Sequence, residues 1–171
     1  MKKLESLIKT YHDFPIKGIA FKDLLGITQN PEVFSELILK MSENQIIKNS
    51  EAIISIEARG FIFGSAISLK ASKPMIFARK PGKLPGDLIQ ENYNLEYGEN
   101  SLSIQKGAIE KYNSFAIVDD LLATGGTVDC VSKLIKRQGK TISGLITVVE
   151  LVELCGREKF DFPVESVLLM K

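Results

Sequence analysis

The stretch Phe115-Ala-Ile-Val-Asp119-Asp120-Leu-Leu-Ala-Thr124-Gly125-Gly126-Thr127 decides the fold that this sequence predicts. Its four apolar residues indicate a buried strand, and two adjacent carboxylates follow at the carboxyl end. A short turn with two glycines and two threonines comes next, and residues 127–138 then show helical spacing. This order is typical of a phosphate site, because the first amides of a helix lack intrahelical partners and the helix dipole places partial positive charge there.

The residue types in this stretch indicate what it binds. The two glycines allow positive φ and close approach of the backbone to an anion, and the threonines add hydroxyl donors. The two aspartates repel phosphate but suit ribose hydroxyls or a magnesium ion. An ordinary α/β turn is one alternative. The paired aspartates of a phospho-acceptor signalling domain are another, although that pair usually lies in the first strand and lacks the Thr-Gly-Gly-Thr loop. We therefore expect the stretch to hold a sugar by its diol and its phosphate together.

The composition indicates a single globular domain spanning residues 1–171. Hydrophobic residues make up 44% of the chain and charged residues 25%, values typical of a domain that buries its own core. The net charge of +1 argues against a general nucleic-acid binder or a polybasic membrane ligand. We therefore expect neither nucleic acid nor a membrane as a partner.

Cysteine and histidine usage bears on location and on metals. The chain has two cysteines, Cys130 and Cys155, without metal-ligand spacing, and a single histidine, His12. This usage excludes a Cys/His zinc site and fits reduced thiols in a cytosol. The N-terminal residues lack the apolar core of a signal peptide, and no segment approaches the roughly 20 apolar residues of a membrane span. We therefore expect a cytoplasmic protein.

Periodicity along the chain predicts helices that alternate with strands. Helical spacing predicts helices over residues 2–11, from Pro31 onward, over 60–69 and over 127–138. Short apolar runs predict strands at 52–56, 75–78, 115–118, 142–149 and 166–169. Alternation over residues 93–106, with a turn at 98–100, predicts a β-hairpin. The series predicts an α/β fold with a largely parallel central sheet flanked by helices on both faces.

A second strand also runs into a charged turn, at Glu57-Ala58-Arg59-Gly60. Arg59 beside the first amides of a helix suits a polyanion through bidentate contacts, although a surface ion pair between Glu57 and Arg59 would explain the same residues. In a parallel sheet this turn and the acidic pair lie at the carboxyl ends of strands, where ligands bind.

The basic loop Arg79-Lys80-Pro-Gly-Lys83 follows the next strand. The separation of Arg79, Lys80 and Lys83 from acidic residues favours anion binding over a solvated surface loop. We expect residues 80–106, which join this loop to the hairpin, to be flexible and to close over the site as a lid, because such a segment is otherwise costly to order. The hairpin tyrosines, Tyr93 and Tyr97, could equally pack on a partner subunit.

Together these segments resemble the adenine-specific members of the type I phosphoribosyltransferase family, over nearly the whole chain. The likeness is carried by residues 13–23, 57–64, 79–86, 95–98, 118–127, 149–151 and 156–159. It implies the type I phosphoribosyltransferase fold, with a small base-binding hood segment over residues 1–30. It also implies transfer of phosphoribosyl from 5-phosphoribosyl 1-pyrophosphate to adenine, giving AMP and pyrophosphate, together with a Mg2+ requirement and a homodimer.

The resemblance further implies a role for each matching residue. The ribose and 5′-phosphate would be held by Asp119, Asp120, Ala123, Thr124, Gly125, Gly126 and Thr127. The pyrophosphate would be held by Glu57, Ala58, Arg59, Lys80 and Lys83, and the family has a cis peptide between the first two. Adenine would be bound by Ala20, Phe21, Lys22 and Leu151. Catalysis would rest on Glu96, the proton donor to the purine, with Arg59 and Lys80, while magnesium is carried mainly by the substrate pyrophosphate and no metal ligand is assigned.

Two departures from the family pattern both concern the base. The family usually has arginine where this chain has Lys22, and its following Thr-Pro is replaced by Leu25-Gly26-Ile27-Thr28. Transfer to another purine (hypoxanthine, guanine or xanthine) is therefore the nearest alternative. A ligand-sensing regulator of the same fold is a more distant one.

Overall fold

The computed structural model describes residues 2–95 and 98–171, with side chains described for residues 2–92 and 101–171. The chain forms two compact units, Met1–Lys40 and Met41–Lys171. The sequence-based expectation of a single domain therefore stays a prediction, and the two units are taken in turn.

The first unit contains a short helix, a two-stranded antiparallel ribbon and the start of a longer helix. Its elements are α1 (Lys2–Glu5), β1 (Lys9–His12), β2 (Ala20–Asp23), the 3-10 helix η1 (Leu25–Gln29) and most of α2 (Pro31–Ser42). The predicted start of a helix at Pro31 is confirmed, and the side chain of Asn30 caps it by accepting a hydrogen bond from the Val33 amide at 3.2 Å.

The helix predicted over residues 2–11 is wrong beyond Glu5. The chain leaves the helix there, and Lys9–His12 form β1, whose register pairs Thr10 with Lys22 and His12 with Ala20. A two-turn helix is marginal on its own. The ladder with β2 gives the backbone of β1 hydrogen-bond partners that the local periodicity could not reveal.

The second unit is built on a sheet of five parallel strands in the order β4-β3-β7-β8-β9. The strands are β3 (Ala52–Ile56), β4 (Met75–Ala78), β7 (Ser114–Leu122), β8 (Thr141–Leu151) and β9 (Val164–Met170). All five residues of β3 are buried, as expected where both faces of a parallel sheet are covered. The predicted largely parallel central sheet is confirmed.

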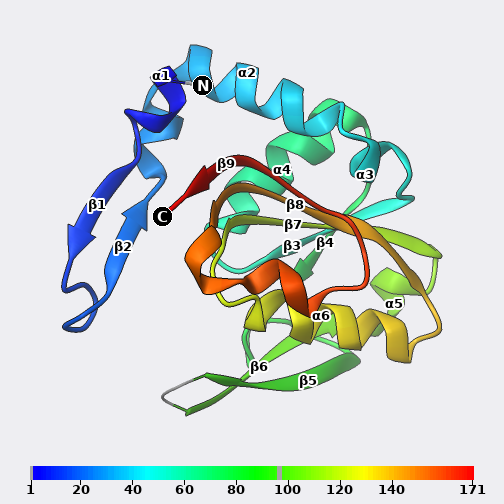
Figure 1. Cartoon of the computed structure of the whole chain (residues 1–171). Helices are drawn as coiled ribbons and strands as arrows, with labels where there is room; N and C mark the ends of the chain where they lie inside the picture. The colour runs from blue at the N-terminus through cyan, green and yellow to red at the C-terminus, as the bar shows by residue number, and fades with distance from the viewer. Residues whose placement is uncertain (1, 96–97) are drawn as a thin grey trace. The chain divides into compact units, whose positions relative to one another are not determined.

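Helices cover both faces of this sheet (Figure 1). Helices α3 (Gln45–Lys48) and α4 (Gly60–Ala71) lie on one face, and α6 (Gly126–Arg137) lies on the other. The buried side of α6 includes Val128, Val131, Leu134 and Ile135, the apolar positions of its helical period. The short helices α5 (Lys106–Ile109), η2 (Val152–Leu154) and η3 (Gly156–Lys159) complete the unit.

The predicted hairpin is confirmed as β5 (Leu88–Leu95) and β6 (Gly98–Gln105). Its turn was misplaced, since Gly98 already belongs to β6 and pairs with Leu95. Near the base of the hairpin, Leu102 and Ile104 are fully buried in the core of the second unit. These side chains are held in the core. Closure over the site as a lid is therefore proposed only for the outer part of the hairpin.

The chain reverses its direction of winding between β3 and β7, which are neighbours in the sheet although β4 and the hairpin lie between them in sequence. In open parallel sheets the crevice at such a switch point, outside the carboxyl ends of the strands, is where ligands bind. The charged turn at residues 57–60 follows β3, and the acidic pair Asp119-Asp120 lies toward the carboxyl end of β7.

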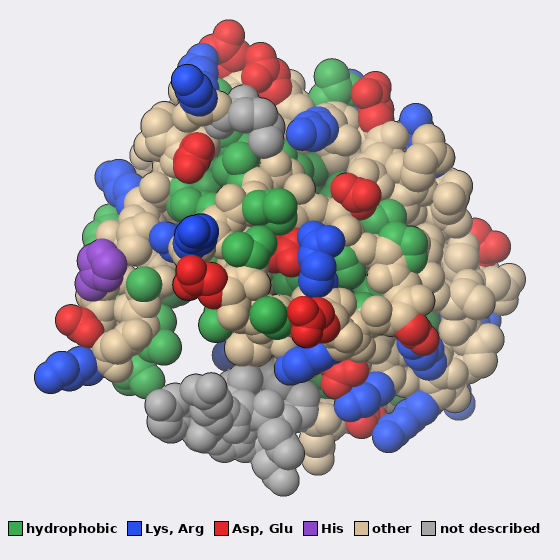
Figure 2. All heavy atoms as spheres, in the orientation of Figure 1, with side chains coloured by type: hydrophobic (Ala, Val, Ile, Leu, Met, Phe, Trp, Pro, Cys, Tyr) green, Lys and Arg blue, Asp and Glu red, His purple; other side chains and the backbone are tan. Residues whose placement is uncertain are grey.

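The described part of the chain has no helix with the length and apolar character that crossing a bilayer requires. On the face drawn in Figure 2, basic side chains are interspersed with acidic ones. Both cysteines are free thiols, with Cys130 buried and Cys155 exposed.

Candidate active site

The acidic pair lies within β7 instead of after it. The strand was predicted to end at Val118, but it continues to Leu122 because its far edge still pairs with β8, where Asp119 faces Thr147. Its pairing with β3 stops at Val118. Asp119 and Asp120 therefore stand where β7 extends beyond β3, at the carboxyl edge of the sheet.

Both carboxylates are buried, with exposed fractions of 8% for Asp119 and 5% for Asp120. Burial raises the pKa of Asp119 well above its usual value, and the neighbouring charge of Asp120 adds to this. Burial also raises the pKa of Asp120, while Arg59 acts in the opposite direction. The site therefore holds two acids that resist ionisation unless a cation or a hydrogen-bond donor joins them.

Arg59 supplies that cation. Its Nε lies 2.7 Å from Oδ2 of Asp120. The residue stands immediately before α4, whose first residue is Gly60. The alternative of a surface pair between Glu57 and Arg59 is thus wrong for this structure, because the turn after β3 directs Arg59 across to β7.

Gly60 lets α4 approach the acidic pair. A Cβ atom at this position would lie 2.7 Å from Oδ1 of Asp119 and 3.3 Å from the carbonyl oxygen of Val118. Neither distance leaves room for a side chain. The start of α4 and the end of β7 are therefore in direct contact across the switch point.

Glu57 holds the basic loop in place. Its carboxylate accepts a hydrogen bond from the Lys80 amide at 2.9 Å and pairs with Nε of Arg79 at 3.3 Å. Burial opposes its ionisation, but the Lys80 amide and Arg79 outweigh this and lower its pKa. Arg79 also donates to the carbonyl of Lys83 at 3.1 Å. Arg79, expected to bind an anion, is instead engaged by Glu57, whereas the side chains of Lys80 and Lys83 are exposed.

The peptide bond between Glu57 and Ala58 is cis, as the family resemblance implied. It joins the end of β3 to the turn that carries Arg59. Because β3 and β4 are neighbours in the sheet, this turn and the loop after β4 begin side by side at the ends of these two strands.

Residues 123–127, which we call the phosphate loop, connect β7 to α6. Gly125 has φ +80° at the N-cap of α6, which confirms the predicted need for a left-handed residue there. Gly126 was expected to share this role but is the first residue of the helix. Residues 121–128 line a hollow of about 200 Å3. Its lining includes the first residues of α6, where amides without intrahelical partners favour an anion.

The residues predicted for the base lie in two places. Ala20, Phe21 and Lys22 belong to β2 in the first unit, where the Lys22 ammonium donates to Thr10 Oγ1 at 3.1 Å. Leu151 is the last residue of β8 in the second unit. The predicted proton donor, Glu96, lies outside the described residues.

Residues 149–151 and 156–159 carried part of the family likeness, but the sequence did not show that polar residues within them pair. Glu150, at the end of β8, is 1% exposed and forms an ion pair with Arg157. Ser166 of β9 donates to the same carboxylate at 2.9 Å. The signal available was Glu150 directly after the predicted strand 142–149 and before Leu151, since a carboxylate among apolar residues needs a partner if the strand continues.

Comparison with known proteins places the chain in a family. The model of the phosphoribosyl transferase domain matches residues 26–168, so the protein belongs to the phosphoribosyltransferases. More specifically, it belongs to the adenine phosphoribosyltransferase family. Adenine phosphoribosyltransferases of Prochlorococcus marinus strains MIT 9515 and CCMP1986 are 72% and 67% identical to it, covering 96% and 100% of both chains.

Solved structures of the same family share the fold. Adenine phosphoribosyltransferase from Thermoanaerobacter pseudethanolicus superposes with a TM-score of 0.91 at 36% identity, covering 99% of both chains. The enzyme from Saccharomyces cerevisiae, complexed with an imino-altritol bisphosphate and adenine, gives a TM-score of 0.87 at 34% identity, covering 95% of each chain. The type I phosphoribosyltransferase fold is therefore confirmed.

Proposed function

We propose that the protein transfers the phosphoribosyl group of 5-phosphoribosyl 1-pyrophosphate to adenine, releasing pyrophosphate and forming AMP, as a pentosyltransferase of purine salvage. The observation that carries this proposal is that the acidic pair and the phosphate loop lie two residues apart in the chain, at the switch point of the sheet. The Saccharomyces cerevisiae enzyme is solved with adenine, and the Trypanosoma brucei enzyme with AMP, pyrophosphate and ribose-5-phosphate.

In the proposed donor site, three sets of residues hold three parts of the substrate. Asp119 and Asp120 accept hydrogen bonds from the ribose hydroxyls, and the phosphate loop, Ala123 to Thr127, holds the 5′-phosphate. The pyrophosphate lies toward Arg59, the Glu57–Ala58 turn, Lys80 and Lys83. The two lysines are exposed and so can reach a ligand, and the Glu57 carboxylate fixes the loop that carries them.

The barrier to transfer falls chiefly through positive charge at the leaving group. Pyrophosphate departs with several negative charges, which Arg59 and Lys80 would stabilise more strongly in a site shielded from water. Arg59 pairs with Asp120 in this structure, so bound ribose hydroxyls would share that carboxylate with it. The predicted role of Glu96 in protonating the purine stays a proposal, as does the binding of adenine by Ala20, Phe21, Lys22 and Leu151.

A magnesium requirement is part of the proposal. The described residues contain no cluster of three or more His, Cys, Asp or Glu side chains able to hold a metal. Magnesium usually binds through one or two carboxylates together with substrate phosphates, and the neighbouring carboxylates of Asp119 and Asp120 fit that donor set. The ion would neutralise pyrophosphate charge.

We also propose a homodimer and a cytoplasmic location. Leu69 of α4 is 84% exposed, and Phe77 of β4, an edge strand of the sheet, is 42% exposed. Phe77 packs edge-to-face on Phe61 at 5.0 Å, and exposed apolar side chains of this kind suit contact with a second copy of the chain. Sedimentation velocity should give twice the mass of the chain, and Leu69→Asp should shift it toward the monomer. The two free thiols support a reducing compartment.

Adenine-dependent release of pyrophosphate from the donor tests the function directly. Rates measured in parallel with hypoxanthine, guanine and xanthine decide whether Lys22 and residues 25–28 preserve adenine selectivity. We expect adenine to be preferred. A faster reaction with another purine would replace adenine in the proposal, and absence of release with all four would overturn it.

A further inference from the structure

The segment that follows β8 lies directly against the phosphate loop. A Cβ atom on Gly156 would lie 2.1 Å from the carbonyl oxygen of Ala123 and 3.1 Å from the amide nitrogen of Gly125. In the other direction, a Cβ on Gly125 would lie 2.9 Å from both the carbonyl oxygen of Gly156 and the ring of Phe160. The two backbones are therefore in contact with no space between them, and the position of one limits the position of the other.

We call residues 155–160 the bracing segment. Its first residue, Cys155, has φ +50°, and this left-handed turn reverses the chain after β8 and brings Gly156 onto the loop. The bracing segment consists of a single short 3-10 helix and its flanking residues. Such a short helix does not hold its own position, so its placement depends on where it is anchored.

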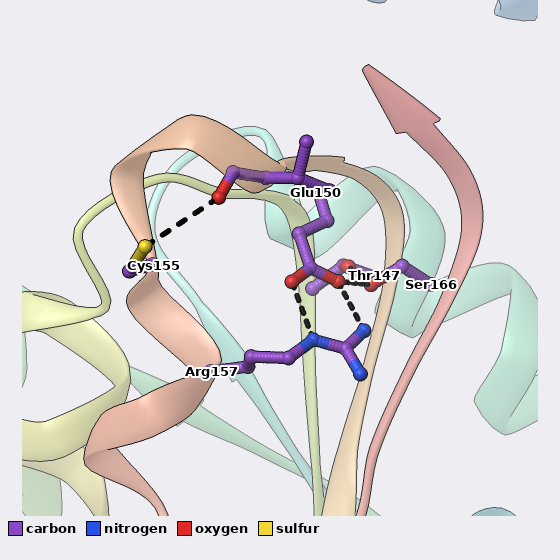
Figure 3. Close-up of polar contacts among 6 residues, drawn as sticks. Thr147, Glu150, Cys155, Arg157 and Ser166 are labelled. Carbon is purple, nitrogen blue, oxygen red and sulfur yellow. Dashed lines mark hydrogen bonds and ion pairs between the residues drawn. The ribbon is translucent and has the colours of Figure 1, made fainter. Parts of the chain in front are cut away.

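The anchor is the ion pair between Arg157 and Glu150 (Figure 3). Arg157 Nε donates to Oε1 of Glu150 at 2.6 Å, and Nη2 donates to Oε2 at 2.5 Å. This two-point contact fixes the direction of the guanidinium as well as its distance. Ser166 of β9 donates to Oε2 at 2.9 Å, and its hydroxyl lies 3.0 Å from that of Thr147.

The place of Glu150 in the sheet makes it suited to this task. It is 1% exposed and pairs in register with Leu122, the last residue of β7 before the phosphate loop. Hydrogen bonding to Arg157 lowers the pKa of its carboxyl. The carboxylate is therefore a fixed, charged point beside the start of the loop, and Arg157 connects it to Gly156 in the adjacent position of the chain.

A second ion pair provides a comparison within the same region. Lys136 of α6 lies 2.5 Å from Asp161, but the two side chains are 45% and 74% exposed. Exposed pairs of this kind contribute little to stability, because solvent screens them and long side chains lose freedom. The pair at Glu150 differs in its acidic partner: the Glu150 side chain is 1% exposed, although that of Arg157 is 47% exposed. The pair with the buried carboxylate is therefore expected to carry the positioning, and the pair at Asp161, with both side chains largely exposed, is the control.

We propose that Glu150 and Arg157 are positioning residues for the donor's 5′-phosphate: their ion pair holds Gly156 against the phosphate loop and so fixes the loop amides in the geometry that binds the phosphate. The proposal rests on the function proposed above. Neither residue touches the substrate in this scheme, and both act through the backbone contact between Gly156 and residues 123–125.

The test compares Arg157→Gln with Asp161→Asn in the full-length protein. Arg157→Gln should raise the KM for the donor and the Kd for ribose 5-phosphate, measured by calorimetry, by roughly tenfold to 100-fold, since a displacement of about 1 Å has effects of this size. The KM for adenine should change by less than twofold. Arg157→Lys, which keeps the charge but loses the fork, should fall between wild type and Arg157→Gln, and Asp161→Asn should match wild type.

A second readout keeps the test independent of turnover. Hydrogen exchange of the amides of residues 123–128 should become faster in Arg157→Gln and not in Asp161→Asn, while amides of β3 stay protected. Ser166→Ala removes one hydrogen bond to Glu150 and leaves the ion pair intact, so it provides a milder variant with the same expected direction if Arg157→Gln does not fold.

Two outcomes would overturn the proposal. One is a Kd for ribose 5-phosphate within twofold of wild type in folded Arg157→Gln or, if that variant does not fold, unchanged hydrogen exchange of residues 123–128 in Ser166→Ala. The other is a parallel rise in the KM for adenine and for the donor. A failure of the proposed function looks different. The wild type would then bind ribose 5-phosphate without releasing pyrophosphate in the presence of adenine, and the calorimetry would still test the positioning.

Discussion

The guanidinium of Arg59 contacts the carboxylate of Asp120, with Nε 2.7 Å from Oδ2. The contact joins the turn after β3 to the acidic pair of β7 across the switch point of the sheet. Because the two residues belong to strands that are neighbours in space and 61 positions apart in sequence, their pairing connects the proposed ribose and pyrophosphate ends of the donor site.

Substitution of Arg59 by Gln should therefore lower turnover strongly. Loss of one cationic contact to the departing pyrophosphate is expected to cost about 2.7–4 kcal/mol of transition-state stabilisation, a factor of roughly 10²–10³ in kcat. Steady-state release of pyrophosphate measures the effect, and circular dichroism checks that the variant is folded. Lys133→Gln, which removes an exposed partner of Asp129 on α6, is the matched control and should keep wild-type turnover. An Arg59→Gln rate close to wild type would contradict the assigned role.

Asp119→Asn should stabilise the protein while abolishing saturable donor binding. Burial raises the pKa of Asp119 in the folded state. The folded protein therefore holds its proton more tightly than the unfolded chain, and stability falls as pH rises from the unfolded pKa, about 3.9, through the raised folded value. The neutral amide removes this cost and can still accept the hydrogen bond that Asp119 Oδ1 receives from the Asp120 amide at 2.9 Å.

The Tm at pH 7 should therefore be higher in Asp119→Asn than in wild type. The advantage over wild type should shrink as the pH falls toward 4. Differential scanning calorimetry over this range, with donor titrations by isothermal calorimetry, measures both parts. A lower Tm than wild type at pH 7, or unchanged donor affinity, would count against this account.

Gly60→Ala should weaken donor binding by a steric conflict, without removing any functional group. The added Cβ would lie 2.7 Å from Oδ1 of Asp119, so α4 or β7 must shift, at a cost of about 1–3 kcal/mol. Donor binding should weaken together with the fall in Tm. Gly107→Ala in α5 is the control, because nothing lies within 4 Å of its added Cβ, and it should be neutral or slightly stabilising. Equal effects of the two substitutions would refute the contact argument.

The hairpin should divide into a functional outer part and a structural base. Replacement of residues 93–100 by a two-residue turn should leave the Tm unchanged and raise donor hydrolysis relative to transfer, because water then reaches the activated sugar. Ile104→Ala, in the buried base, should instead destabilise the protein by about 2–5 kcal/mol with unchanged partitioning in the folded fraction. Product analysis by ion-exchange chromatography measures the partitioning, and equal hydrolysis in the shortened variant would exclude a lid.

The sequence by itself determined the parts that depend on local pattern. The apolar run before Asp119 predicted β7, because burial on both faces of a sheet requires apolar residues. The glycine before α6 predicted the phosphate loop, because a left-handed turn favours glycine. The helical spacing that follows predicted α6. The motif of residues 118–127 also carried the family. Local spacing failed at residues 9–12, where pairing with β2 outweighed a marginal helix.

The tertiary structure alone decided which charged groups meet. Glu57 pairs with Arg79 and Arg59 with Asp120, although adjacency in sequence favoured a Glu57–Arg59 pair. The contact of Gly156 with the phosphate loop and its anchor at Glu150 were equally hidden. These relationships depend on strand order and on the direction in which each turn leaves the sheet. Those are set by the packing of the whole unit, and no short stretch of sequence contains them.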